Sequence, residues 1–269
     1  MSYTETDAAN SALIKIGEKK LTDIDTDTGT VAEKCREQFG KLRKEVLRAH
    51  PWNCASRRAK LQQLTATITN ATTEDPVKIT ASNEFEDGDH ITIEDAEGMA
   101  ELNDESYLVA NVTSADFKLQ DEDGEDVNGT SYTPYTSGGT ARRTPAFQFD
   151  YMYQKPTNCL RIISQVDPDD DSVEYDHVVE GDFILTDEDE CYIKYIIDLT
   201  DPDKWDAMLR EAFAFRLAAE LAYPQAGSKT LAAEMDKKYQ DMLAAAWSVD
   251  GQEGVMEVVD MDDWIDARG

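Results

Sequence analysis

The sequence predicts an α+β protein in which an antiparallel helix bundle with a small antiparallel β-sheet carries an inserted all-β, barrel-like domain. Three observations lead to this fold class. Capped helical patterns lie at both ends of the chain, and short segments rich in Thr, Val, Ile and Tyr lie between them. The composition also shifts in the middle, because residues 65–141 hold 18 Asp and Glu against 2 Lys, with no cysteine.

Four helices are expected from caps and apolar spacing. Thr4 with Asp7, and Thr30 with Glu33, have the spacing of capping boxes in front of apolar residues at helical intervals. The second helix must end just before Pro51, because proline disfavours a helical conformation in the residue that precedes it. The predicted helices span about 4–17, 31–49, 203–223 and 229–247.

The β segments divide the chain into domains. Strand patterns at 65–144 are separated by acidic and glycine turns and predict an inserted acidic β-domain. Further strand candidates lie in 147–199, so residues 1–64 and 145–269 are predicted to form one discontinuous domain of helices and sheet. Residues 249–269 are too acidic for a core of their own, yet they carry apolar side chains, which predicts a tail for docking. Its surface is either a neighbouring subunit or partner protein, or the tail's own chain.

The charge balance limits the function classes. The chain has 56 acidic and 26 basic residues, for a formal charge of −30. This argues against general affinity for nucleic acid and against adhesion to anionic membranes, because both need Lys and Arg. It favours basic partners or a surface that repels DNA, and the plainer alternative is an acidic, solvated surface.

The N-terminus lacks the basic start and apolar run of a signal peptide, and no apolar stretch is long enough to span a bilayer. The four cysteines are far apart and form no CxxC motif, which favours reduced thiols in a protein made in a cytoplasm. We therefore expect no contact with membranes.

No motif of enzyme chemistry is present, since GxSxG, HExxH and GxGxxG are all missing. HPWNCASRR at 50–58 places His50 near Cys54, but no third catalytic partner accompanies them, and the stretch is interpreted as a joint where a helix ends and a strand begins. DIDTDTGT at 23–30 has EF-hand-like spacing but lacks the glycine and the final glutamate of that loop. We expect no enzyme activity, no catalytic residue, no metal site and no cofactor.

One basic surface stands out. Between Val31 and Lys60, nine Lys and Arg residues face three Glu residues, a local charge of +6. Lys34, Lys41 and Arg48 follow one another at intervals of seven residues and therefore line one side of the second helix. This side either pairs with acidic neighbours in the same chain or forms a docking surface for another subunit, a partner protein or passing DNA. The candidate interface residues, with those of the tail, are Lys34, Lys41, Arg43, Lys44, Arg48, Arg57, Arg58, Val259, Trp264, Ile265 and Arg268.

The order of several segments resembles the tail tubular protein A family of short-tailed bacteriophages. The segments are HPWNCASRRAKL, YMYQKPTNCLRI, YDHVVEGDFILTDEDECYIKYI, FAFRLAAELA and the closing WIDARG. The resemblance covers about 1–64 and 145–269. The inserted stretches EDPVKITASNEF and EDGDHITI resemble a β-barrel module of phage structural proteins, which is similar to a half-domain of ubiquitin-activating enzymes. No cysteine lies in the insert, so no thioester chemistry carries over.

The resemblance implies a structural virion protein, a head-to-tail adaptor or connector made in the host bacterial cytoplasm. It implies a ring of twelve copies between the portal protein and a tail nozzle of the tail tubular protein B type, with tail fibres as further partners. DNA would pass through the channel during genome ejection without specific binding. The alternative is an accessory protein whose β insert binds a receptor, glycan or metal, with Tyr107, Tyr132 and Tyr135 on its surface, although such aromatic residues are more often core partners.

Overall fold

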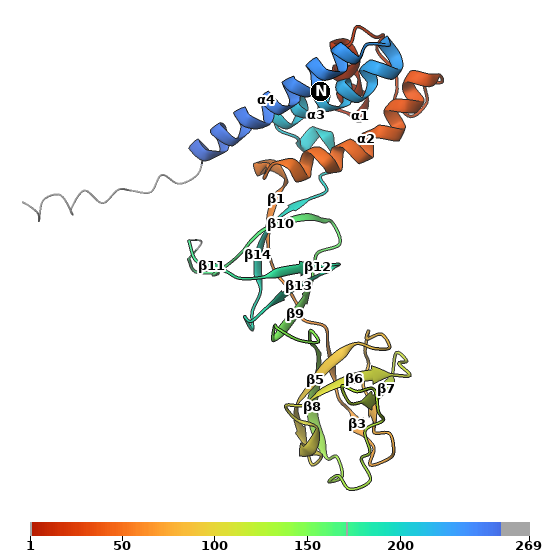
Figure 1. Ribbon diagram of the computed structural model, residues 1–269, viewed down its shortest axis with the longest axis vertical. Helices are drawn as coiled ribbons and strands as arrows, with labels where there is room; N and C mark the ends of the chain where they lie inside the picture. Colours follow the sequence, from red (N-terminus) through yellow and green to blue (C-terminus); the bar gives the residue numbers. More distant parts are fainter. Residues whose placement is uncertain (1, 171, 254–269) are drawn as a thin grey trace, which may run out of the picture. The chain divides into compact units, whose positions relative to one another are not determined.

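The computed structural model describes residues 2–170 and 172–253 (Figure 1). Within these residues the chain forms two compact units. The helical unit takes its residues from 2–57, 158–163 and 195–253, and the β unit takes the rest. No observation tests the predicted domain boundaries as folding units, but contacts divide the chain at other places, because 164–194 group with the β-rich middle of the sequence.

Four α-helices build the helical unit. They are α1 (Glu5–Lys15), α2 (Thr30–Ala49), α3 (Ala207–Ala226) and α4 (Lys229–Glu253). Helix α3 packs against the other three. Its contact face is rich in small residues, which lets the helix axes approach closely, and the largest fully buried side chains around it include Trp52 and Phe213. None of the described helices is long and apolar enough to cross a membrane.

The helix ends follow local chemistry. The capping box at Thr4 is confirmed, since its hydroxyl accepts from the N–H of Asp7 and the Asp7 carboxylate accepts from the N–H of Thr4. The second predicted box is wrong, because Gly29 occupies the cap of α2 and makes no side-chain bond. Helix α2 ends at Ala49, as the following proline requires.

The start of α3 also differs from the prediction. A 3₁₀ turn, η3 (Pro202–Lys204), comes first, and Asp206 then caps α3 by accepting from the N–H of Leu209 at 2.7 Å. Pro224 lies inside the last turn of α3 rather than ending it, and Gly227 closes the helix in the left-handed conformation.

Three sheets contain the 14 strands of the described residues. The four-stranded sheet has the order β1 (Ser56–Lys60), β14 (Tyr192–Ile197), β10 (Cys159–Val166) and β11 (Glu174–Tyr175). The three-stranded sheet has the order β12 (Val178–Glu180), β13 (Phe183–Thr186) and β9 (Tyr151–Gln154). Two further 3₁₀ turns are η1 (Asn53–Ala55) and η2 (Ala100–Leu102).

The seven-stranded sheet closes on itself. Its order is β2 (Thr65–Thr67), β8 (Ser137–Arg143), β5 (His90–Glu97), β6 (Ser106–Ala110), β7 (Asp116–Gln120), β4 (Lys78–Thr80) and β3 (Asn70–Ala71). The two end strands are joined by only Ile68 and Thr69. The N–H of Ile68 donates to Gly139 on β8, and the N–H of Thr69 donates to Thr80 on β4, each at 2.9 Å. One continuous segment therefore bridges both ends of the sheet and forms a barrel.

The barrel has its own hydrophobic core. Alternate residues of its strands point inward, and the buried set includes Ile91, Ile93, Tyr107, Phe117 and Leu119. A period of two along each strand places every second side chain on the same face, so alternating sequences fill the interior.

The predicted fold class is wrong in its proportions. A helix bundle with one small sheet does not describe a chain with three antiparallel sheets and four α-helices in its described residues. The physical reason is strand pairing. The segment predicted as one β region at 147–199 contains strands that pair in two separate sheets, with β9 joining β13 and β10 joining β14.

Candidate functional site

The predicted basic surface is partly engaged inside the helical unit. Arg43 makes two parallel hydrogen bonds to Asp198, from Nε to Oδ1 at 2.7 Å and from Nη2 to Oδ2 at 3.0 Å. Bidentate pairs of this kind are strong among charged hydrogen bonds, and both side chains are mostly buried. Lys44 Nζ lies 4.0 Å from the same carboxylate, and Lys41 Nζ lies 3.6 Å from Glu37. These cations neutralise acids of their own unit.

Farther along the chain, the predicted interface residues Arg48 and Arg57 bind the backbone. Arg48 donates to the carbonyl of Leu160, and Arg161 donates to the carbonyl of Arg48 at 3.2 Å. Arg57 donates to the carbonyls of two preceding residues at 3.1 and 2.7 Å. Lys34 lies half-buried on α2. The contacts favour pairing within the chain, and the partner surface expected on these residues stays a prediction.

The other predicted interface residues lie outside the part of the chain that the structure describes. They are Val259, Trp264, Ile265 and Arg268.

The HPWNCASRR stretch is the predicted joint, with η1 placed between α2 and β1. The His50 ring is buried between two indoles, with ring centroids 4.6 Å from Trp52 and 4.7 Å from Trp247. The Trp52 indole donates to the carbonyl of Val46 at 2.9 Å. Burial raises the pKa of the Cys54 thiol to about 11, so this thiol is protonated at neutral pH and a poor nucleophile. The stretch acts in packing.

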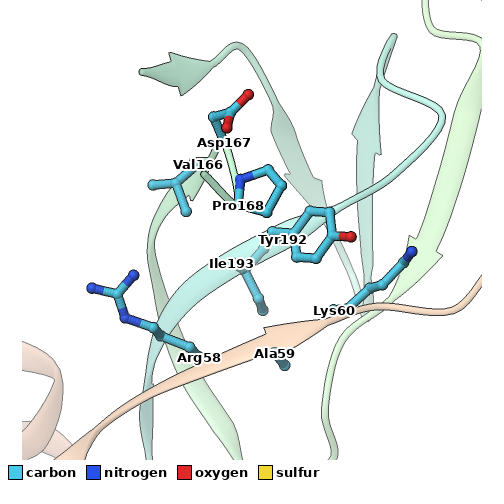
Figure 2. A pocket seen from close by; sticks show the side chains of 8 residues that line it. All are labelled: Arg58, Ala59, Lys60, Val166, Asp167, Pro168, Tyr192 and Ile193. Atoms are coloured by element: carbon cyan, nitrogen blue, oxygen red, sulfur yellow. The ribbon is translucent and has the colours of Figure 1, made fainter. Parts of the chain in front are cut away.

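A cleft of about 320 Å³ lies in the β unit where β1, β14 and the turn after β10 meet (Figure 2). Arg58 and Lys60 flank Ala59 on β1, and Figure 2 shows the two cationic side chains at opposite ends of the cleft. Its lining residues are Arg58, Ala59, Lys60, Val166, Asp167, Pro168, Tyr192 and Ile193. Apolar atoms make up most of the wall between the two cations.

The polar groups of the cleft are held in place by one another. Lys60 pairs with Glu190 and lies 5.2 Å from the ring centroid of Tyr192, whose hydroxyl donates to Glu190 at 2.7 Å. The bonds from Lys60 and then Tyr192 lower the pKa of Glu190. Asp167 accepts from two backbone N–H groups of its own turn and from the Tyr175 hydroxyl, which lowers the Asp167 pKa. Both carboxylates are therefore ionised and oriented at neutral pH.

The sequence indicated only part of this site. Arg58 and Lys60 belonged to the basic run, but nothing pointed to the wall at Val166, Pro168 or Tyr192. The segments come together only because β1 pairs with β14, more than a hundred residues later in the sequence. A local pattern carries no signal for such a pairing.

A larger hollow of about 730 Å³ lies on the barrel. Its acidic lining residues are Glu101, Asp104, Glu105, Asp121, Glu122, Asp123 and Asp126. Tyr107 and Tyr132 also line it, but Tyr107 is 6% exposed and belongs to the barrel core, and Tyr135 donates to the carbonyls of Ile68 and Gly138. No group of three or more possible metal ligands occurs among the described residues.

The acidic loop at 23–30 uses its carboxylates on its own backbone. Asp23 Oδ1 accepts from the N–H groups of Asp25 and Thr26, and Asp27 Oδ2 accepts from that of Thr22 at 2.6 Å. These bonds fix the turn between α1 and α2, which is the ordinary role of aspartates in such loops.

One comparison with known families gives a match. Residues 74–144 match the family model of the ubiquitin-activating enzyme E1 FCCH domain. No curated protein matches the chain. The matched residues cover most of the barrel, the region that the sequence analysis likened to a half-domain of ubiquitin-activating enzymes.

The resemblance to the tail tubular protein A family is overturned by this match, because it points to E1 enzymes and nothing indicates a phage head-to-tail adaptor. The predicted roles in a phage tail, in joining a portal to a nozzle and in genome ejection are wrong for the same reason. The alternative, a receptor, glycan or metal protein acting through the insert, has no better support. The twelve-copy ring, the portal, nozzle and fibre partners and the virion location stay predictions that no observation tests.

Proposed function

We propose that this protein acts by binding a segment of another protein, without catalysis, and that the cleft between Arg58 and Lys60 receives one apolar side chain of that segment. The observation that carries the proposal is the cleft itself, an apolar wall of Val166, Pro168 and Ile193 with a cation at each end. Such a site combines an anchor pocket with charged surroundings, which is how peptide-binding surfaces obtain affinity and specificity.

The size of the cleft supports a side chain as its ligand. Pockets for small molecules and cofactors measure roughly 300–1,000 Å³. At about 320 Å³, this cleft is at the lower limit of that range. A single leucine or aromatic side chain fits this volume, and burying one apolar side chain contributes about 1.5–3 kcal/mol.

The charges at the edge of the cleft favour a bound segment with acidic residues beside its apolar anchor side chain. The side chains of Arg58 and Lys60 are both exposed. A carboxylate next to the anchor would join the pair that Lys60 already makes with Glu190 and would face Arg58 at the other end. Exposed pairs of this kind contribute about 0.2–1 kcal/mol each and weaken with salt.

The thiols support a role without catalysis, although the barrel matches a domain of an enzyme. Burial raises the pKa of Cys35 and of Cys54 to about 11 and that of Cys191 to about 12. Thiols with these pKa values hold almost no thiolate at neutral pH, and thiolate is the reactive form.

The test measures binding of fluorescein-labelled pentapeptides by polarisation. One peptide places Leu between two Asp residues, and its control places Leu between two Lys residues. We expect the acidic peptide to bind more tightly, and Lys60→Ala to weaken that binding by about two- to fivefold, as an exposed ion pair does.

Filling the cleft provides the decisive variant. Ala59→Trp should reduce binding of the acidic peptide at least tenfold, because the indole occupies the anchor position. Ala115→Trp is the matched control, since Ala115 is exposed on the barrel, away from the cleft lining. Equal binding by wild type and Ala59→Trp, with both folded by circular dichroism, would show that the cleft is not the binding site.

A further inference from the structure

A second apolar hollow lies in the helical unit, beside the end of α4. It measures about 290 Å³ and is formed by the joint after α2, the start of α3 and the last turns of α4. Trp52, Met208, Ala246 and Val249 give it apolar walls, with the half-buried Cys54 beside them. The hollow is separate from the cleft of the β unit, and it does not enter the function proposed above.

Two large apolar side chains are exposed at this place. Trp247 is 54% exposed and Val249 is 39% exposed, although the Trp247 ring also contacts the buried His50 ring, with centroids 4.7 Å apart. Val249 also lines the hollow. Exposed apolar surface that continues into a hollow marks a place where another apolar group binds.

The segment that follows α4 has the matching composition. Residues 254–269 read GVMEVVDMDDWIDARG, with five Asp and Glu against one Arg, and with Trp264 and Ile265 between aspartates. Arg57 supplies the complementary charge, because its exposed guanidinium donates to the carbonyl of Cys54 at 3.1 Å, beside the hollow. The Asp206 carboxylate at the same hollow is engaged as the cap of α3.

The connection along the chain favours the same molecule as the source of this segment. Val249 stands four residues before Glu253, which on a helix is a rise of about 6 Å. Trp264 comes eleven positions after Glu253, and an extended chain of that length spans up to about 37 Å. A tether this short gives an effective concentration in the millimolar range, so the chain's own segment outcompetes a second copy at ordinary dilution.

We propose that residues 254–269 dock on the helical unit of the same chain, with the Trp264 side chain in the hollow and the neighbouring carboxylates near Arg57. The proposal assigns an occupant to the exposed surface of Trp247 and Val249.

A disulfide-trapping experiment on the full chain tests this. Cysteines are introduced by Ala207→Cys, at an exposed residue of the hollow, and by Ile265→Cys, in a Cys54→Ser background that removes the thiol already lining the hollow. Mild oxidation of a dilute sample should link the two introduced cysteines within one chain, at least tenfold faster than in the matched control pair Lys19→Cys with Ile265→Cys. Peptide mapping by mass spectrometry identifies the link.

Adding Trp264→Ala should slow the trapping at least fivefold, and Arg57→Gln should slow it about twofold, as loss of one exposed ion pair does. Circular dichroism of each variant establishes that it is folded. Equal trapping rates at Ala207 and Lys19 would overturn the docking site. A covalent dimer as the main product would overturn the assignment to the same chain and show that a second copy supplies the segment.

Discussion

The helical core and the barrel core are built in different ways. Around α3 the core combines many small residues, such as Ala212 and Ala218, with a few large rings, among them Phe213 against Phe39 at 4.7 Å and Trp205 at 5.0 Å. The barrel core also contains alanines, but β-branched side chains such as Ile91 and Ile93 are more frequent in it, and one aromatic pair, Phe85 and Phe117, lies at 5.5 Å.

The difference shows two ways to stabilise one chain. Helices satisfy their backbone hydrogen bonds internally, so the helical core depends on the packing between helices. The barrel satisfies its backbone only when the sheet closes, and closure requires Ile68 and Thr69 to bond two different strands. The barrel is therefore more sensitive to changes of backbone geometry than the helical unit is.

The largest effects should come from truncating one core at a time. Phe213→Ala should destabilise the helical unit by about 3–5 kcal/mol, and Phe117→Ala should destabilise the barrel by the same amount, as buried Phe→Ala changes do. Hydrogen exchange followed by mass spectrometry should show faster exchange in α1–α4 for the first variant and in β2–β8 for the second. If either variant speeds exchange equally in both regions, the two cores unfold as one cooperative unit.

A pair of glycines tests the dependence of the barrel on backbone geometry. Gly98 has φ 89°, and a Cβ added there would lie 2.4 Å from the carbonyl oxygen of Pro134, whereas Gly124 has φ 83° with open space around it. Gly124→Ala should destabilise the barrel by about 1–2 kcal/mol, because a residue with a Cβ is strained in the left-handed conformation. Gly98→Ala should cost more, because backbone must move. Urea unfolding measures the loss of stability in both variants. Equal losses would show that the backbone at Gly98 shifts with little energy to make room for the Cβ.

The smallest effects are expected in the loss of folding stability at acid pH. Hydrogen bonds from the Thr4 backbone N–H and hydroxyl lower the pKa of Asp7 in the helical unit, and Lys78 followed by Thr113 lowers that of Asp116 in the barrel. A depressed folded pKa means that the stabilisation is present above the unfolded value of about 3.9 and is lost as pH falls through the folded pKa.

Asp7→Asn should therefore flatten the acid dependence of helix exchange only, and Asp116→Asn that of barrel exchange only. Hydrogen exchange between about pH 2 and 5 makes the comparison, after correction for the intrinsic dependence of exchange on pH. An unchanged profile in both variants would show that other carboxylates dominate the acid response.

Local signals predicted the parts of the fold that depend on neighbouring residues. The cap at Thr4 and the end of α2 before Pro51 follow from bonds and sterics within a few positions, and the structure confirms both. The predicted cap at Thr30 failed because Gly29 already occupies the cap, with φ 127°. Cys54 and His50 were expected to lack a catalytic role. The full burial of His50 and the raised pKa of the Cys54 thiol support that interpretation without testing activity.

The candidate site was harder to predict from the sequence than the helix ends. Arg58 and Lys60 stood out as charges, but the same residue types served backbone carbonyls at Arg48 and an acid of the same unit at Arg43. Only the positions of their neighbours separate these roles. The family resemblance failed for a related reason, because the short segments that supported it report local features such as a helix end, and such features occur in many folds.

The sequence by itself determined the acidic charge, the positions of the helices and a central, cysteine-free β region. The tertiary structure decided that the remaining strands form two further sheets, that the barrel closes through Ile68 and Thr69, and that β1 meets β14 to form the cleft. The reason is the range of the interactions. Helical periods and caps act over a few residues, whereas strand pairing joins residues more than a hundred positions apart and is selected by the packing of the whole chain.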